Sequence, residues 1–455
     1  MALQHRGHAG RGVSLAVEQT LADLRAGRLQ GATRLDLEGG AQGLQEFPRE
    51  IFALADTLEV LNLSGNALRE LPEDLHLLQR LRILFASGNA FTELPRALGR
   101  CAQLEMVGFR SNRIARVPAE SLPPRLRWLI LTDNAIEALP EALGERPRLQ
   151  KLMLAGNALQ TLPDSLARCH SLELLRLAAN RFEALPPWLL QLPRLAWLGV
   201  AGNPLTAARE AQAQNTAVPA IAWERLRVGE LLGEGASGVI HAAQWLREDG
   251  GAEPVALKLF KDGLTSDGRP DSERAASLAA GAHPALVGLK GRLRQHPDGR
   301  AGLVLARVGA DWRNLAAPPS FASCTRDVYA PDAAFDAGTV RRIAADIAAA
   351  AAHLHAHGLV HGDLYAHNVL WRPAQGDAPA RALLGDLGAA ACAPAALQPA
   401  LRALDVLAFG RLLDELLSRC AEADALPALQ ALRDDCLQPL PAARPGSDAL
   451  VQRCA

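Results

Sequence analysis

The sequence predicts a multidomain chain in which an α/β solenoid, with parallel strands on its concave face, precedes an α+β domain. Three observations predict this fold class. An asparagine recurs every 22 or 23 residues through the first half. A glycine-rich segment between two strand patterns opens the second half, and Asp363, Asn368 and Asp386 follow it. With 455 residues, 49% apolar residues and a net charge of -1, the chain is globular and too long for one ordinary core.

The first half is a repeat array. Each unit follows L-x-x-L-x-L-x-x-N-x-L-x-x-L-P, as in residues 58–72, LEVLNLSGNALRELP. One unit cannot bury its leucines alone, so the units stack, and each asparagine satisfies backbone groups of neighbouring turns. The recurring residues are Asn66, Asn89, Asn112, Asn134, Asn157, Asn180 and Asn203. The pattern resembles the intracellular class of leucine-rich repeats over residues 33–205, with a helical cap in residues 1–32 and a divergent first repeat at residues 35–48.

The strand residues that alternate with the buried leucines face the concave side of such a solenoid. They are unusually apolar here: Phe85, Met106, Trp128, Ile130, Met153, Leu174 and Trp197. Arg110, Lys151 and Arg176 are interspersed among them. Single exposed apolar residues are ordinary, but a run across adjacent strands forms a patch that marks a binding surface. We expect a protein partner there, either a separate protein or the chain's own second domain.

The second domain opens with a phosphate-binding pattern. Residues 231–239, LLGEGASGV, carry Gly233, Gly235 and Gly238, which let backbone amides approach phosphates. Alone, this motif also opens dinucleotide-binding units, but those need a helix straight after the glycines, whereas residues 239–245 continue as a strand. The strand V-A-L-K ends at Lys258, whose apolar neighbours alternate around it. We expect Lys258 to bridge the phosphates of ATP.

The segments HGDLYAHNVL (residues 361–370) and GDLG (residues 385–388) carry the residues that phosphoryl transfer needs. Its loose transition state requires a hydroxyl held in line and a phosphate charge neutralised by metal. Asp363 would receive and orient the hydroxyl. Asn368 and Asp386 offer the oxygen ligands that Mg²⁺ or Mn²⁺ prefers. Either tripeptide alone more often marks a turn or a helix cap; their order and spacing together favour a site.

With these motifs in family order, residues 223–455 resemble the eukaryotic-type protein kinases, closest to the serine/threonine class. The resemblance implies a bilobal α+β fold, ATP with Mg²⁺ or Mn²⁺, and Glu273 as the carboxylate partner of Lys258. Asp271 and Glu273 also fit solvated charges at a helix start. Adenine would be read by backbone groups near residues 306–308. The nucleotide-contacting residues expected on this basis are Leu232, Gly233, Gly235, Gly238, Val239, Ala256, Lys258, Leu305 (the gatekeeper), Arg307 and Val308.

The departures from that family are informative. Gly362 stands where most members place the arginine that pairs with a phosphorylated activation loop, and residues 389–404 contain no Ser, Thr or Tyr. We therefore expect constitutive competence, or control by another part of the chain. Tyr365 replaces the usual lysine that contacts the transferring phosphate, and His367 replaces the arginine of tyrosine kinases. Catalysis is then slow, or another Arg or Lys reaches the site.

No A-P-E lies between Asp386 and Asp405, so Arg444 lacks its usual glutamate partner and the peptide-docking segment is short. Three functions remain open at this point. The first is a serine/threonine protein kinase whose repeats recruit a partner. The second is a nucleotide-binding pseudokinase scaffold, and the third is a kinase of a small hydroxylated molecule.

Composition narrows the setting. No run of eighteen apolar residues exists, residues 1–12 lack the apolar core of a signal peptide, and nothing requires nucleic acid. Seven scattered cysteines give neither a disulfide framework nor metal-ligand spacing, which favours a reducing, cytoplasmic location. The alanine-rich composition, with arginine used in preference to lysine, favours a bacterial source. Residues 206–222 are the expected linker, and residues 317–338 are the expected place of regulatory phosphorylation.

Overall fold

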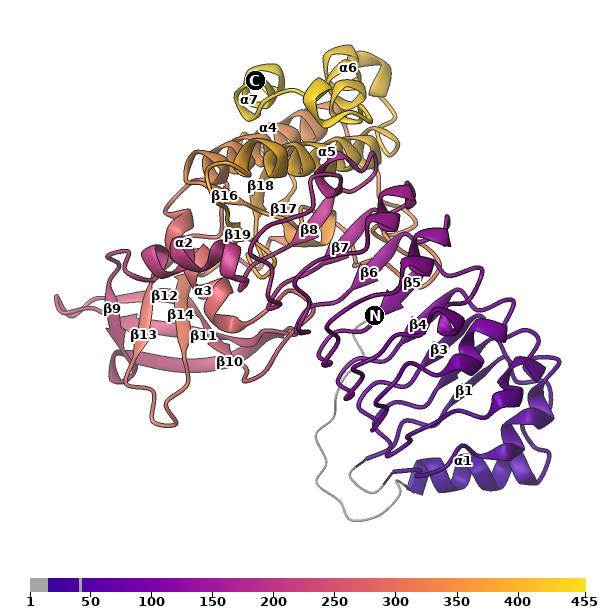
Figure 1. Ribbon diagram of the computed structural model, residues 1–455. Helices are drawn as coiled ribbons and strands as arrows, with labels where there is room; N and C mark the ends of the chain where they lie inside the picture. Colours follow the sequence, from indigo (N-terminus) through magenta and orange to yellow (C-terminus); the bar gives the residue numbers. More distant parts are fainter. Residues whose placement is uncertain (1–14, 41–42) are drawn as a thin grey trace. The chain divides into compact units, whose positions relative to one another are not determined.

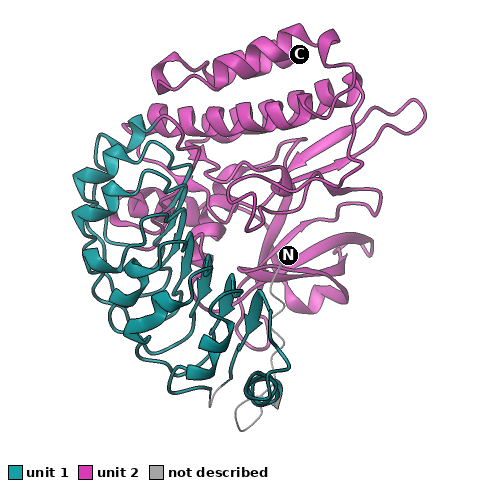
Figure 2. Ribbon diagram, turned by 90° about the vertical axis from the view of Figure 1, so that its right-hand side faces the viewer, with its two compact units in different colours: residues 1–175, 180–192 teal, residues 176–179, 193–455 magenta. Residues whose placement is uncertain are grey.

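A computed structural model describes residues 15–40 and 43–455. The chain divides into two compact units, residues 1–175 with 180–192, and residues 176–179 with 193–455 (Figure 2). Residues 1–14, which include the start of the expected cap and the segment judged not to be a signal peptide, lie outside the described residues. The second unit thus includes short pieces of the last repeats together with the whole second domain.

The first unit begins with helix α1 (Leu15–Arg25), followed by a series of three-residue strands that pair in parallel (Figure 1). The sheet order follows the sequence from β1 to β8. These strands are β1 (Arg34–Asp36), β2 (Val60–Asn62), β3 (Ile83–Phe85), β4 (Met106–Gly108), β5 (Trp128–Ile130), β6 (Lys151–Met153), β7 (Leu174–Arg176) and β8 (Trp197–Gly199). The predicted α/β solenoid with parallel strands is confirmed.

Short 3-10 helices alternate with these strands. They are η1 (Arg49–Leu54), η2 (Glu73–Leu77), η3 (Arg96–Arg100), η4 (Ala119–Ser121), η5 (Glu141–Glu145), η6 (Asp164–Arg168) and η7 (Leu189–Gln191). The first six each follow a proline in extended conformation. This proline belongs to a Leu-Pro pair before η2, η3, η5 and η6, to Phe-Pro before η1 and to Val-Pro before η4. Proline suits this place because its fixed φ directs the chain into the helix and it has no N–H to leave unpaired.

Each repeat asparagine joins two turns of the solenoid. The Asn134 amide donates to the carbonyls of Phe109 at 2.9 Å and Leu131 at 3.0 Å, and its Oδ1 accepts from the Ile114 amide at 3.0 Å. Asn66, Asn89, Asn112 and Asn157 repeat this arrangement in their own turns. The leucines between them, such as Leu129 and Leu131, are fully buried. The leucines therefore form the apolar core, and the asparagines satisfy the backbone groups of adjacent turns beside it.

Replacing Asn134 with alanine should lower the free energy of unfolding by on the order of 2–4 kcal/mol, because one N–H and two carbonyls lose their partner inside the solenoid. Urea titration followed by circular dichroism measures the loss. Glu137→Ala, three residues on at an exposed position, is the matched control and should change stability by less than about 0.5 kcal/mol. Equal stability of both variants would show that the hydrogen bonds of the repeat asparagine contribute nothing to the free energy of unfolding.

The residues expected on the concave side are less exposed than a free apolar patch would be. Phe85, Trp128, Ile130 and Met153 are half-buried, and Met106, Leu174 and Trp197 are buried. Within this set, Lys151 Nζ lies 4.1 Å from the centre of the Trp128 ring, and the indole N–H of Trp128 points to Met153 Sδ at 3.4 Å. The apolar strand residues therefore pack against one another and against a cation.

In the second unit, one mixed sheet runs in the order β10-β11-β12-β14-β13-β9. Its strands are β9 (Ala220–Ala222), β10 (Leu226–Glu234), β11 (Gly238–Leu246), β12 (Ala252–Phe260), β13 (Leu289–Arg294) and β14 (Gly302–Ala306). Helix α3 (Pro270–Ala280) lies between β12 and β13 in the sequence. Val255, Leu257 and Val304 are fully buried in the core of this lobe, which fixes the strand that carries Lys258.

Helices dominate the other lobe of this unit (Figure 1). They are α4 (Ala337–Ala356), α5 (Gln398–Leu417), α6 (Pro427–Cys436) and α7 (Ser447–Cys454), with the short helices η9 (Ala366–Asn368), η10 (Ala423–Ala425) and η11 (Pro441–Ala443). Short strands complete it: β15 (Arg313–Asn314), β16 (Leu359–Val360), β17 (Val369–Arg372), β18 (Arg381–Leu384) and β19 (Ala391–Cys392). The predicted two-lobed α+β domain is confirmed.

The stretch expected as a linker carries structure of its own. Helix α2 (Pro204–Gln214) occupies its first half, and the short helix η8 (Trp223–Arg225) follows it and β9. Glu210 accepts from the Ser272 hydroxyl at 3.0 Å and from the Gly202 amide at 2.8 Å, and Gln214 donates to the Asp271 carbonyl at 2.8 Å. These contacts fix α2 against the start of α3.

Candidate active site

Lys258 and Glu273 form an ion pair in the first lobe of the second unit. Lys258 is near the end of β12, and Glu273 is in the first turn of α3. Their side chains are 12% and 5% exposed, and Glu273 Oε2 is buried without a hydrogen-bond partner among the described residues. The pair predicted from sequence is thus brought together, with one carboxylate oxygen left over.

The glycine-rich turn between β10 and β11 is open. No atom lies within 4 Å of the point that a Cβ on Gly233 or Gly235 would occupy, whereas a Cβ on Gly238 would lie 2.7 Å from the Leu259 carbonyl oxygen. Gly238 is therefore required by close packing on β12, and the other two glycines line free space. Lys261 Nζ donates to the Gly235 carbonyl at 3.0 Å, which ties the turn to the strand that carries Lys258.

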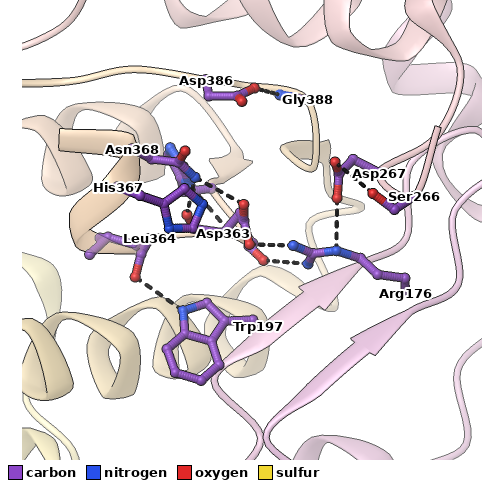
Figure 3. A network of polar contacts seen from close by, with 12 residues as sticks. Arg176, Trp197, Ser266, Asp267, Asp363, Leu364, His367, Asn368, Asp386 and Gly388 are labelled. Atoms are coloured by element: carbon purple, nitrogen blue, oxygen red, sulfur yellow. Dashed lines mark hydrogen bonds and ion pairs between the residues drawn. The ribbon is translucent and has the colours of Figure 1, made fainter. Parts of the chain in front are cut away.

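Asp363 and Asn368 are joined in the catalytic loop. The Asn368 amide donates to the Asp363 carbonyl at 2.8 Å and to its carboxylate Oδ2 at 2.9 Å. Both hydrogen bonds use Asn368 Nδ2, so they do not engage its Oδ1 atom. Asp386 follows β18 with φ of 48° and accepts from the Gly388 amide at 3.0 Å (Figure 3). Its side chain is exposed, as a group that meets a ligand from solvent must be.

Buried Asp405, in α5, holds the backbone of this loop. Its carboxylate accepts from the amides of His361 at 2.7 Å and Gly362 at 3.0 Å, and it contacts His355 Nε2 at 2.9 Å. His361 Nε2 in turn reaches the Gly385 carbonyl at 3.0 Å. The two segments that carry Asp363 and Asp386 are therefore fixed relative to each other by groups at the bottom of the site.

The residues expected to surround adenine lie on and after β14. Leu305 ends the strand with Ala306 and is half-buried, as is Val308, whereas Arg307 is exposed and pairs with Glu230 at 3.3 Å. The Ala306 amide already donates to the Gly288 carbonyl at 2.7 Å. Across the sheet, Ala256 pairs in register with Leu305. Leu232 is 46% exposed beside the glycine-rich turn, and Val239 is half-buried.

Arg176 reaches the candidate catalytic residue Asp363. Its guanidinium pairs with the Asp363 carboxylate, donates to the Gly362 carbonyl at 3.0 Å, and lies 2.9 Å from Asp267 Oδ1 (Figure 3). Burial alone would raise the pKa of Asp363, but Arg176, with His367 and His361, holds it below its ordinary value. Desolvation and the neighbouring Asp363 and Asp386 raise the pKa of Asp267.

A tryptophan packs on the same loop. Trp197 stacks on Tyr365 with ring centres 3.9 Å apart, and its indole N–H donates to the Leu364 carbonyl at 3.0 Å (Figure 3). Gly362 has φ of 69°, and a Cβ there would lie 2.7 Å from the Leu198 carbonyl. The glycine found where the family places arginine is therefore required by close packing of the chain on this loop.

Sequence reasoning named Arg176 and Trp197 only as concave residues, and it missed Asp267. The sequence offered only an indirect hint of them: Gly362 and Tyr365 depart from the kinase pattern at the two positions that Leu198 and Trp197 contact. Arg444, expected to lack a partner, donates instead to the carbonyls of Gln438 at 2.8 Å and Ala403 at 2.9 Å. It also reaches the carbonyls of Pro439 at 3.2 Å and Pro193 at 3.4 Å.

Residues 317–338, the expected place of regulatory phosphorylation, contribute a buried acid, Asp327. Asp327 pairs with His367 Nδ1 at 2.7 Å. Burial lowers the pKa of His367, but this hydrogen bond and the charges of Asp363, Asp327 and Asp386 together outweigh burial and raise it. Nearby, Glu415 accepts from the Tyr329 hydroxyl at 3.1 Å. Burial, together with Asp327, raises the pKa of Glu415 to about 7. Of the hydroxyls expected to be phosphorylated here, Thr325 and Tyr329 are buried, which leaves Ser320 and Ser323 the better candidates.

Glu415→Gln should stabilise the protein at pH 8 more than at pH 5. The pKa of Glu415 is about 7 in the folded state against 4.5 when unfolded, so the folded state binds the extra proton between these values and stability falls as pH rises through them. At about 1.4 kcal/mol per unit, the gain at pH 8 is about 3 kcal/mol. Glutamine keeps an acceptor for Tyr329. Urea titration at both pH values measures the gain, and exposed Asp434→Asn should show none; a pH-independent effect of Glu415→Gln would contradict the assignment.

The donor set fits a divalent metal and a triphosphate. Asn368 Oδ1 and the exposed Asp386 carboxylate are hard oxygen ligands, and the space above Gly233 and Gly235 is free for phosphates. Among the described residues, no cluster of three or more His, Cys, Asp or Glu side chains suits a metal. A metal here would thus share its coordination with the nucleotide, since Asn368 and Asp386 supply few ligands.

The seven cysteines are all buried, and none of them forms a disulfide within the described residues. Within residues 15–40 and 43–455, no helix is both long and apolar enough to cross a membrane.

Family models match parts of both halves of the chain. A family model for protein tyrosine and serine/threonine kinases matches residues 226–388. Leucine-rich-repeat models match residues 57–78, 124–182 and 147–205. Among solved structures, a leucine-rich-repeat protein of Leptospira interrogans is 27% identical with a TM-score of 0.34, over 42% of this chain and 54% of that one. The chain thus spans about half the length of that protein. No significant match is found among curated proteins.

Proposed function

Starting from a chain in which leucine-rich repeats precede a protein kinase domain, we propose that it transfers the terminal phosphate of ATP to serine or threonine hydroxyls of a protein. The observation that carries the proposal is that one compact unit holds both the Lys258–Glu273 ion pair and the Asp363–Asn368 hydrogen bonds. A scaffold that only bound nucleotide would have no need for all four groups in this arrangement.

Each residue has a defined role in this reaction. Lys258, oriented by Glu273, binds the phosphates, and the amides of the glycine-rich turn cover them. Asn368 and Asp386 would hold Mg²⁺ or Mn²⁺, which neutralises phosphate charge when bound. Asp363 orients the acceptor hydroxyl and receives its proton as the new O–P bond forms and ADP leaves. Because Arg176 keeps the pKa of Asp363 low, Asp363 is ionised and ready to accept a hydrogen bond at neutral pH.

The repeats would recruit the protein partner through their strand face, as repeat proteins with extended concave surfaces do. A location in the cytoplasm fits seven cysteines that remain thiols.

A second candidate is a small hydroxylated acceptor. One observation favours it: Trp197 stacks on Tyr365, two residues after Asp363, and so covers a part of the loop on the acceptor side. Together with the missing A-P-E, this leaves less surface for an extended peptide than a kinase of peptides has. The acceptor rather than the donor distinguishes the two candidates.

The test is transfer of label from γ-labelled ATP, with and without Mg²⁺, to the chain itself and to casein or histone. Magnesium-dependent label on protein, absent in Asp386→Asn, supports the protein kinase. Magnesium-dependent ADP formation that rises with an added small polyol, with no label on protein, supports the small acceptor. Binding of ATP without ADP formation under any condition would overturn both and leave the nucleotide-binding scaffold.

A further inference from the structure

The catalytic loop lacks the cation that its family places two residues after the catalytic aspartate, because Tyr365 stands there. Tyr365 has no compensating polar role, since its hydroxyl is buried without a hydrogen-bond partner among the described residues and its ring stacks on Trp197. Developing charge on a transferring phosphate is stabilised by a cation fixed beside it, and the loss of one such group costs about 10²–10³ in rate. The catalytic loop itself therefore supplies no cation for the transferring phosphate.

Arg176 is a cation that lies against the catalytic loop. It pairs with one oxygen of Asp363 while Asn368 donates to the other, so the guanidinium and the Asn368 amide converge on the Asp363 carboxylate. Its side chain is 3% exposed, and its pKa remains above the ordinary value because Asp363 and Asp267 outweigh the cost of burial. Arg176 is thus a permanent, fixed positive charge against the catalytic loop.

Its geometry leaves donors for a further anion. A guanidinium has five N–H groups. Nη1 donates one N–H to the Gly362 carbonyl and Nη2 donates one to the Asp363 carboxylate. Nε lies 2.9 Å from Asp267 as an ion pair and has no hydrogen-bond partner among the described residues. Each terminal nitrogen keeps one further N–H, and such a pair matches two oxygens of a phosphate.

The surrounding residues are shaped to hold Arg176 in this place. At the corresponding third strand position, the preceding repeats carry Asn62, Phe85, Gly108, Ile130 and Met153, none of them cationic. The next strand has Gly199 there, and a Cβ on Gly199 would lie 3.1 Å from Arg176 Cδ. Gly362 likewise makes room for the Leu198 carbonyl. Two glycines and the Trp197–Tyr365 stack therefore adapt the catalytic loop to this piece of the chain.

We propose that Arg176, contributed by the repeat segment, is a catalytic residue that faces the transferring phosphate in place of the missing loop lysine. The inference rests on the proposed function. In the transfer step, the acceptor oxygen bonds to the γ-phosphorus, the bond from that phosphorus to the β,γ-bridging oxygen breaks, and the hydroxyl proton passes to Asp363. Arg176 stabilises the negative charge on the γ-phosphate oxygens during this exchange. The domain would then be catalytically incomplete without residues 176–179 and 193–199.

The experiment compares full-length native chain with Arg176→Met and Arg176→Lys, measuring ADP formation with casein as acceptor over a range of ATP concentrations. We expect Arg176→Met to lower kcat by 10²–10³, with KM for ATP changed by less than about threefold, since the interaction acts in the transition state. Arg176→Lys keeps the charge without the fork and should lose about tenfold. Exposed Arg181→Met, five residues on, is the matched control and should keep native kcat.

A kcat of Arg176→Met at the native value would overturn the proposal, and a raised kcat would show instead that Arg176 blocks the acceptor site. Thermal melting and binding of a fluorescent ATP analogue establish that the variant is folded. If Arg176→Met does not fold, Arg176→Lys decides, because it retains a charge against Asp363: a kcat equal to or above native would overturn the assignment. Absence of ADP formation by the native chain would be a failure of the proposed function, not of Arg176 alone.

Discussion

Replacing Asp363 with asparagine should lower kcat for phosphoryl transfer by about 10²–10⁴ while ATP binding stays within a few-fold of native. The reason lies in the two protonation-dependent tasks of its carboxylate. In the proposed mechanism Asp363 orients the acceptor hydroxyl and takes its proton; asparagine retains the shape and one acceptor oxygen but cannot take the proton. ATP contacts Lys258 and the glycine-rich turn instead, so the ground-state complex loses little.

Two measurements check this expectation. Steady-state ADP formation gives kcat and KM for ATP, and a fluorescent ATP analogue gives the dissociation constant directly. Asp377→Asn changes an exposed acid in the same lobe and should leave both unchanged. If Asp363→Asn retained native kcat, the proton would be leaving by another route and the assignment of Asp363 would be wrong. Loss of nucleotide binding together with kcat would indicate a disturbed fold.

Asp363→Asn also has a predictable structural consequence. Arg176 would keep its contacts to Asp267 and the Gly362 carbonyl but lose its charged partner on the loop. A part of the rate loss would then come from a displaced Arg176. The kcat of the double variant Asp363→Asn with Arg176→Met separates the two contributions, because groups that act as one unit give losses that do not multiply.

The repeats could be predicted from sequence because their signal is redundant. Seven asparagines in one register define the strands and turns, and Asn134 then makes the bonds that its position requires. The short helices after each Leu-Pro followed less directly. Their 3-10 form and the packing of α2 against α3 depend on tertiary contacts such as Glu210 with Ser272, which no local pattern encodes.

The candidate site divides in the same way. Lys258, Asp363, Asn368 and Asp386 each lie in a short motif, and the order and spacing of those motifs were enough to predict them as one set. Arg176 precedes Asp363 by 187 residues and sits in an otherwise ordinary repeat. Its role depends on which strand ends next to the catalytic loop, and this is a property of the folded chain. Only the unusual residues Gly362 and Tyr365 indicated that a cation from outside the kinase motifs would have to reach the site.

Asp405→Asn should lower the free energy of unfolding of the second unit by about 2–4 kcal/mol and reduce kcat. Asp405 accepts from two backbone amides and contacts His355, and its side chain is 2% exposed. Asparagine carries an NH₂ group in place of one carboxylate oxygen, and this group cannot accept, so it places a donor against the amide of His361 or Gly362 and leaves that amide unsatisfied. The backbone before Asp363 then loses its anchor, which accounts for the loss of rate.

The pH dependence identifies the charge as the cause. Burial would raise the pKa of Asp405, but His355 and the backbone amides bring it below its ordinary value. A carboxyl with a depressed folded pKa contributes stability above its unfolded pKa of 3.8, and this contribution is lost as pH falls through the folded value. The stability difference between native chain and Asp405→Asn should therefore be full at pH 7 and shrink below about pH 4. Asp414→Asn, on the exposed side of α5, is the control for urea titrations at both pH values and should differ little from native. A difference for Asp405→Asn that did not change with pH would assign the effect to lost packing, and a native-like stability would show that α5 does not anchor the catalytic loop through this carboxylate.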